Sequence, residues 1–92
     1  MTEMDKLEQY LRENGYNYKH KSNYDSSLFR LDAIVVYDEN GDYLWDAICH
    51  RGSYGYEEGK LEIMGTIVRD DIEDTVEGWL TAQDIIDRLE AK

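Results

Sequence analysis

The sequence predicts a single α+β domain over residues 1–92, in which an antiparallel sheet of three or four strands is packed on one face by an N-terminal and a C-terminal helix. Three observations support this prediction. Helical periodicity with capping signals occurs near both ends of the chain, apolar residues alternate through its middle, and the length suits one modest core. The expected order is therefore helix, three or four strands, helix.

Residues 2–14 are expected to form the first helix. Thr2 is a suitable N-cap, and Asp5 stands three residues later, as in a capping box. Met4, Leu7 and Leu11 share one face at helical spacing, so this helix should pack on the sheet through that face.

A first strand is expected at residues 16–21, where Tyr16, Tyr18 and His20 alternate with polar residues, and residues 22–27 have the composition of a turn. Two interpretations of this locally basic segment stay open. It can be an edge strand that its lysines protect from aggregation. It can also be a surface for single-stranded nucleic acid, formed by Tyr16, Tyr18, Lys19, Lys21 and Tyr24. The overall negative charge of the protein favours the edge strand.

Residues 28–50 predict a central hairpin, because apolar residues occupy every second position on both sides of a turn. A three-residue loop, Glu39 to Gly41 with a left-handed Gly41, places Tyr37 opposite Tyr43. The other expected pairs are Val35 with Trp45, Ala33 with Ala47 and Leu31 with Cys49. In this register one continuous apolar face lies against the core, and Arg30, Asp32, Asp46 and His50 lie on the opposite face.

The rest of the chain predicts a glycine-rich loop at 51–60, a long strand over 61–68 and a short helix over 70–77 that ends at Gly78. Gly65 interrupts the strand, which indicates a bulge or a close backbone approach. Trp79 is expected to pack into the core. Thr81 and Asp84 form a second capping-box signal, and the buried stripe of the final helix is Ala82, Ile85, Ile86 and Leu89.

The net charge of −11 is unevenly distributed. Residues 1–37 contain six acids and five bases, whereas residues 38–92 contain fifteen acids and five bases. Such a field repels nucleic acid and anionic lipid and attracts basic partners. We therefore expect neither direct nucleic-acid binding nor membrane binding.

Composition argues against several kinds of catalysis. One cysteine and two histidines have no recognisable zinc spacing, so no metal or other cofactor is expected. Cys49 and His50 are strand neighbours that point to opposite faces, so they are not expected to act as a nucleophile and its base. An acidic N-terminus unlike a secretory signal, together with the single cysteine, favours a cytoplasmic location.

The expected function is non-catalytic: a small acidic protein that binds another protein through a negatively charged surface. A compact acidic domain can fill the basic channel of a nucleic-acid-processing enzyme by mimicking phosphate charge, the strategy of many small phage-encoded inhibitors of DNA-processing and defence enzymes. The partner would then be a basic protein, such as a nucleic-acid-binding enzyme. The candidate partner-binding residues are Asp70, Asp71, Glu73, Asp74, Glu77, Glu57, Glu58, Tyr54 and Tyr56.

Two alternatives stay open. The chain can be an accessory or regulatory subunit, or a structural protein that forms a homodimer through an exposed strand edge. It can also be a small enzyme or metal-binding protein that uses His50 and nearby carboxylates. That alternative requires one pocket to be lined by Arg30, Asp32, Asp46 and His50.

Overall fold

The two helices begin where the capping signals place them. The computed structural model describes residues 1–24, 30–69 and 76–91. Helix α1 spans Glu3–Glu13 and helix α2 spans Ala82–Glu90. Each helix is preceded by a threonine N-cap in a complete capping box. The two boxes are Thr2 with Asp5 and Thr81 with Asp84. Because these bonds satisfy backbone N–H groups that no helical turn can reach, they fix both helix starts locally.

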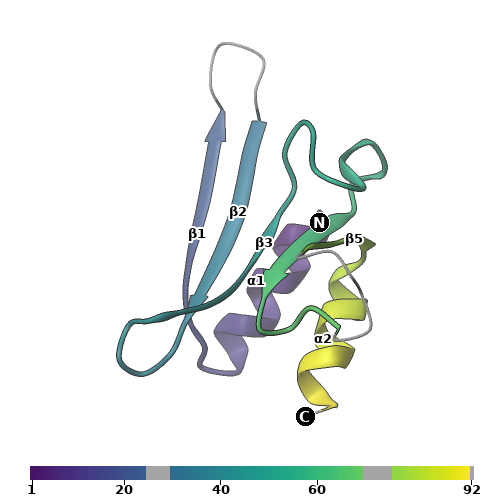
Figure 1. The fold of residues 1–92 in the computed structure, drawn as a ribbon. Coiled ribbons are helices and arrows are strands. Elements are labelled where there is room, and N and C mark those ends of the chain that lie inside the picture. The colour runs from purple at the N-terminus through teal and green to yellow at the C-terminus, as the bar shows by residue number, and fades with distance from the viewer. Residues whose placement is uncertain (25–29, 70–75, 92) are drawn as a thin grey trace.

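The sheet has five antiparallel strands in sequential order: β1 (Asn17–Tyr24), β2 (Arg30–Tyr37), β3 (Tyr43–Ile48), β4 (Leu61–Gly65) and β5 (Val76–Leu80). Helices α1 and α2 contact each other and lie together on one face of this sheet (Figure 1). The predicted α+β class is therefore confirmed, and the sheet has five strands rather than three or four. The additional strand is β5, in which Val76 and Glu77 pair with β4 where the sequence predicted the end of a short helix.

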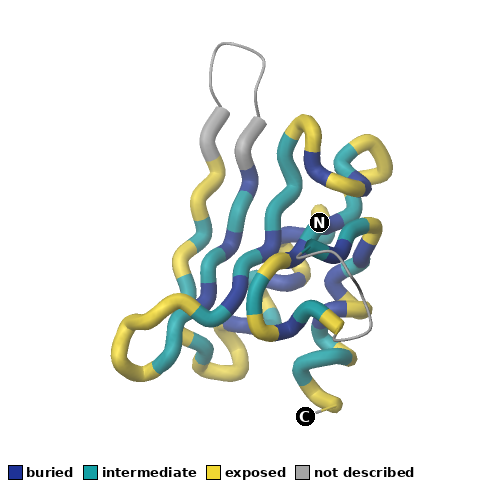
Figure 2. The backbone as a smooth tube through the Cα atoms, viewed as in Figure 1, coloured by how far each residue is buried: buried dark blue, intermediate teal, exposed yellow. Residues whose placement is uncertain are grey.

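The core lies between the sheet and the two helices (Figure 2). Met4, Leu7 and Leu11 of α1 are buried, as expected, and Ala82 and Ile85 of α2 are buried with them. The sheet and the turn after β4 contribute the remaining buried apolar side chains, which are Ile34, Val36, Trp45, Ala47, Leu61, Ile63, Ile67 and Leu80.

The central hairpin has the expected loop but a different register. The Asp38 N–H donates to the Asp42 carbonyl at 2.8 Å, and Gly41 has φ +84°, so the three-residue loop is confirmed. Tyr37 pairs with Tyr43, but a bulge then places Val36 opposite Trp45. The extra residue of that bulge is Leu44, because one step along β2 corresponds to two steps along β3.

This bulge makes the predicted pairs of Val35 with Trp45 and Ala33 with Ala47 wrong. Beyond it, Val35 lies opposite Asp46 and Ile34 lies opposite Ala47. Since a one-residue slip exchanges the two faces of a strand, Ile34 and Val36 face the helices. The predicted inward residues Ala33, Val35 and Tyr37 point to the other face, which we call the open face because no described element packs on it.

Gly65 ends β4 at a close backbone approach. A Cβ atom at this position would lie 2.5 Å from the Leu44 carbonyl oxygen and 2.7 Å from the Trp45 Cα, so only glycine fits. The chain then turns, with the Thr66 N–H donating to that Leu44 carbonyl at 3.0 Å. The sequence-based expectation of a close approach is confirmed, whereas the predicted strand stops before Ile67 and Val68.

Edge strand β1 carries Tyr18 and His20 toward the helices and exposes Lys19 and Lys21, as the edge-strand interpretation predicts. In the part of the chain that the structure describes, neither helix combines the length and the apolarity that crossing a bilayer requires.

Candidate protein-binding site

The loop between β3 and β4 is held in place by its buried serine. The Ser53 N–H and hydroxyl both donate to the His50 carbonyl, at 2.8 and 2.7 Å, and the His50 N–H donates back to the Ser53 oxygen at 3.1 Å. After this turn, a short 3₁₀ helix at Tyr56–Glu58 leads into β4. The loop is therefore built around local hydrogen bonds, as its serine and glycines favour.

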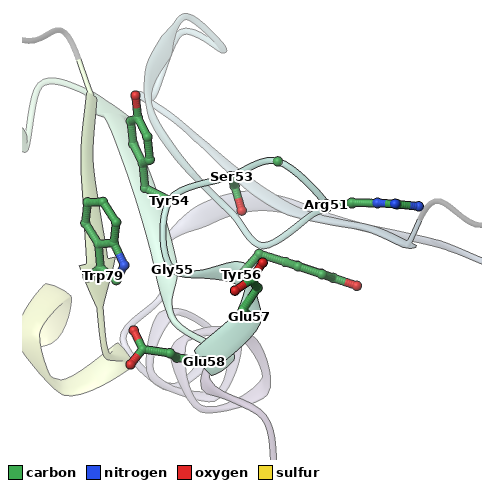
Figure 3. Close-up of a pocket in the computed structure, with 9 residues that line it drawn as sticks. Arg51, Ser53, Tyr54, Gly55, Tyr56, Glu57, Glu58 and Trp79 are labelled. Atoms are coloured by element: carbon green, nitrogen blue, oxygen red, sulfur yellow. The ribbon is translucent and has the colours of Figure 1, made fainter.

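Tyr54 of this loop stacks on Trp79 of β5. Their ring centroids are 5.1 Å apart and their planes differ by 18°. Both rings are accessible, with Tyr54 49% and Trp79 56% exposed. Figure 3 shows the Tyr54 ring above the Trp79 ring, both on the side of the loop that faces β5. We call this pair the aromatic platform.

Backbone contacts hold the platform together. The Trp79 N–H donates to the Tyr54 carbonyl at 3.3 Å, and Glu62 of β4 accepts the Tyr54 N–H at 3.2 Å. A Cβ at position 78 would lie 2.2 Å from the Tyr54 Cβ, so Gly78 allows the loop to lie directly on β5. The platform is thus a fixed feature of the fold.

Trp79 has a left-handed backbone, with φ +57°. This is the only non-glycine residue with positive φ among the described residues. For a bulky side chain such a conformation is unfavourable, and residues held this way concentrate at functional sites. The predicted burial of Trp79 is wrong, and no sequence signal indicated its exposure, because the contact with Tyr54 that holds it is not local.

Around the platform, the loop forms a depression of about 440 Å³ lined by Arg51, Gly52, Ser53, Tyr54, Gly55, Tyr56, Glu57, Glu58 and Trp79. The carboxylates of Glu57 and Glu58, which we call the loop carboxylates, are exposed. In Figure 3 the Glu58 side chain extends on the same side of the loop as Trp79, whereas Arg51 and Tyr56 extend to the other side. Four residues that the sequence analysis predicted to contact a partner, Tyr54, Tyr56, Glu57 and Glu58, thus line this depression, but the Tyr56 side chain extends away from the platform.

Glu77 is not part of this surface. Its side chain is only 8% exposed and binds Arg88 of α2 through two hydrogen bonds, of 2.6 and 2.8 Å. The bonds from Arg88 hold the pKa of Glu77 below its usual value of 4.5, despite burial. Glu77 therefore joins β5 to α2. The other acids predicted to contact a partner from this run, Asp70, Asp71, Glu73 and Asp74, lie outside the described residues.

A second group of polar residues lies under α1. The His20 ring on β1 contacts Asp32 of β2 at 2.6 Å through Nε2 and Glu8 of α1 at 3.1 Å through Nδ1. Burial disfavours the charged ring, but the hydrogen bonds to Asp32 and Glu8 outweigh burial and raise the pKa of His20 above 6.5. The sequence did not indicate this cluster, because the predicted register places Asp32 on the other face of the sheet.

Two residues of the alternative enzyme site, Asp32 and Asp46, lie on opposite faces of the sheet. Asp32 faces the helices, whereas Asp46 is on the open face, where it accepts a hydrogen bond from the Tyr43 hydroxyl at 2.8 Å. Cys49 and Asp32 do line a cavity of about 280 Å³. His20 cannot serve there as a base toward Cys49 in this arrangement, since carboxylates occupy both of its ring nitrogens.

Within residues 1–24, 30–69 and 76–91, no three His, Cys, Asp or Glu side chains are grouped so that they could hold a metal ion.

Comparisons of the chain with protein-family models, with curated proteins and with solved structures found no match.

Proposed function

We propose that this protein binds a positively charged segment of another protein through the aromatic platform and the loop carboxylates. The observation that carries the proposal is the exposed stack of Tyr54 on Trp79, in which Trp79 keeps an unfavourable backbone conformation. Tryptophan and tyrosine are the residues most enriched among those that dominate binding energy at protein interfaces. An exposed pair that the backbone already orders loses little conformational entropy on binding.

The negative charge around the platform favours a positively charged partner. Glu57 and Glu58 are exposed beside the platform, and the whole chain has a net charge of −11. A basic segment would be attracted over a distance, and its lysine or arginine side chains would meet aromatic faces as well as carboxylates. The partner chemistry that fits best is therefore a basic peptide segment or a basic protein groove.

Among basic grooves, the nucleic-acid channel of a DNA- or RNA-processing enzyme is the form that an acidic domain of this size can fill. Inhibition by charge mimicry is the specific version of the proposal. It rests on the charge alone, and Asp70, Asp71, Glu73 and Asp74 would add to it.

The experiment is a pull-down from lysate of the source organism or its host with tagged wild-type protein, eluted in rising salt steps. Two double variants are compared, Glu57→Lys with Glu58→Lys at the platform, and Glu13→Lys with Glu90→Lys on the exposed surface of the helices. Both pairs change the net charge by the same amount. The comparison therefore distinguishes a local binding site from a general effect of the net charge of the protein. We expect the first pair to lose the partner by about tenfold or more and the second to retain it.

Equal retention by both double variants would contradict the proposal, as would equal loss. Circular dichroism of each variant checks that folding is unchanged. Release of the partner at moderate salt is expected, since exposed charges are screened within about 10 Å at 0.1 M salt.

A further inference from the structure

The open face of the sheet carries apolar side chains, interspersed with charged ones, that no described element covers. Helices α1 and α2 both pack on the opposite face (Figure 1). The register of β1 to β4 places two rows of side chains on the open face. One row is Lys19, Val35, Asp46 and Met64, and the other is Lys21, Ala33, Ile48 and Glu62.

Strand β2 is apolar on both of its faces. The residues Ala33, Ile34, Val35 and Val36 follow one another, and only Ile34 and Val36 are buried by the helices. Continuous apolar runs are typical of strands that are covered on both sides, whereas a strand with one solvated face alternates with polar residues. The sequence of β2 therefore fits a sheet whose second face is also covered.

Two of the large hydrophobic side chains that remain exposed lie side by side at this face. Tyr43 is 49% exposed and Met64 is 46% exposed. The Tyr43 hydroxyl is 3.3 Å from the Met64 carbonyl and 2.8 Å from Asp46. They extend the apolar surface of β2 across β3 and β4.

The two rows of the open face also carry no net charge, although the whole chain has a net charge of −11. The rows contain two lysines, Lys19 and Lys21, and two carboxylates, Asp46 and Glu62. The excess negative charge of the chain, −11 in total, therefore comes from residues outside these two rows. A like-charged second copy can approach this face without the repulsion that it would meet elsewhere.

We propose that two copies of this chain associate through their open faces, with a two-fold axis that runs parallel to the strands between β2 and β3. This axis places β1 of one copy over β4 of the other and β2 over β3, at equal heights along the strands. Lys21 then lies over Glu62 of the second copy, and Ala33 lies over its Ile48. In the other row, Val35 lies over Asp46 and Lys19 lies over Met64. A two-fold axis perpendicular to the strands would instead bring β1 onto β1, with lysines facing lysines, which disfavours it.

The arrangement is that of two stacked sheets, which pack about 10 Å apart with their side chains interdigitated. Strand β5 and the aromatic platform lie outside the four overlapping strands. The dimer therefore does not depend on the proposed partner binding, and either can fail without the other.

The first test is the mass in solution, measured by light scattering and by sedimentation equilibrium over a range of concentrations. The expected mass is twice the 10.8 kDa of one chain. Val35→Asp places a carboxylate opposite Asp46 of the second copy at both symmetric contacts, and it should give a monomer with an unchanged circular dichroism spectrum. A wild-type protein that stays monomeric up to about 100 µM, well above the range of stable homodimers, would overturn the proposal.

The second test uses charge reversal and does not depend on a core substitution. Lys21→Glu and Glu62→Lys should each weaken the dimer by about tenfold or more, because each places like charges opposite each other at both symmetric contacts. An equal mixture of the two variants should form a heterodimer, since every contact then pairs opposite charges. Arg12→Glu, on the exposed surface of α1, changes the net charge as Lys21→Glu does and should leave the dimer intact.

Failure of the mixture to restore association would overturn the two-fold arrangement, as would a dimer that none of these variants weakens.

Discussion

Arg88 donates two hydrogen bonds to the buried Glu77 carboxylate, from Nη1 to Oε1 at 2.6 Å and from Nη2 to Oε2 at 2.8 Å. The same Nη1 donates to the Ile67 carbonyl at 3.1 Å. One guanidinium thus joins α2 to β5 and to the turn after β4. An acid that the sequence assigned to a partner surface is instead part of the packing between helix and sheet.

Replacing Arg88 by methionine should lower the free energy of unfolding by roughly 3 kcal/mol, because it removes the two short hydrogen bonds to a buried carboxylate. Glu77 then keeps only its longer contacts with Arg69, whose N–H donates to it at 3.3 Å and whose Nε lies 3.4 Å away. Urea unfolding followed by circular dichroism measures this loss. Lys6→Ala is the matched control, since Lys6 forms an exposed ion pair with Glu3 at 3.0 Å and its loss should cost less than about 1 kcal/mol. Similar losses in the two variants would show that the buried ion pair contributes no more to the free energy of unfolding than an exposed one.

Stability should depend on pH through His20. The pKa of this residue is raised above 6.5 in the folded protein, so its contribution is fully present below pH 6.5 and is lost as the pH rises through the folded value. In His20→Gln we expect a smaller change in unfolding free energy between pH 6 and pH 9 than in the wild type. The imidazole titration, followed by NMR, gives the pKa directly, and a value below 6.5 would contradict this account.

The close approach at Gly65 predicts a large effect of a single methyl group. Gly65→Ala combines a positive φ with a Cβ only 2.5 Å from the Leu44 carbonyl oxygen, so we expect a loss of about 3 kcal/mol. Gly41→Ala is the control, because φ is +84° there but no atom lies within 4 Å of the added Cβ. It should cost about 1 kcal/mol. Equal costs at the two positions would mean that the backbone contact with β3 is not tight.

Trp79→Gly should separate stability from binding. Glycine removes the strain of the left-handed backbone, about 1 kcal/mol, and forfeits a ring stack of similar value. The unfolding free energy should therefore change by less than about 1 kcal/mol while partner capture falls by about tenfold or more. Tyr54→Ala removes the stack without the relief of strain and should be the less stable of the two. Full partner capture by Trp79→Gly would exclude the platform as the binding site.

Local features of this chain were determined by its sequence. Thr2 with Asp5 and Thr81 with Asp84 act over three residues, so the starts of both helices followed from residue types alone. The left-handed Gly41 and the length of its loop are local for the same reason. The loop residues Tyr54, Tyr56, Glu57 and Glu58 could be selected in advance because they are neighbours in the chain.

Tertiary structure decided which face of the sheet is inside. Alternation shows that a strand has two faces, but β2 is apolar on both, so its sequence does not select one. The choice was made by the bulge at Leu44, whose carbonyl accepts a hydrogen bond from Thr66, twenty-two positions later. Because of this extra residue, Asp32 faces the helices, where it contacts His20, and Val35 lies on the open face. The exposure of Trp79 and the burial of Glu77 likewise depend on contacts with Tyr54 and Arg88. These partners lie on other elements of the fold, so no local pattern in the sequence indicates the contacts.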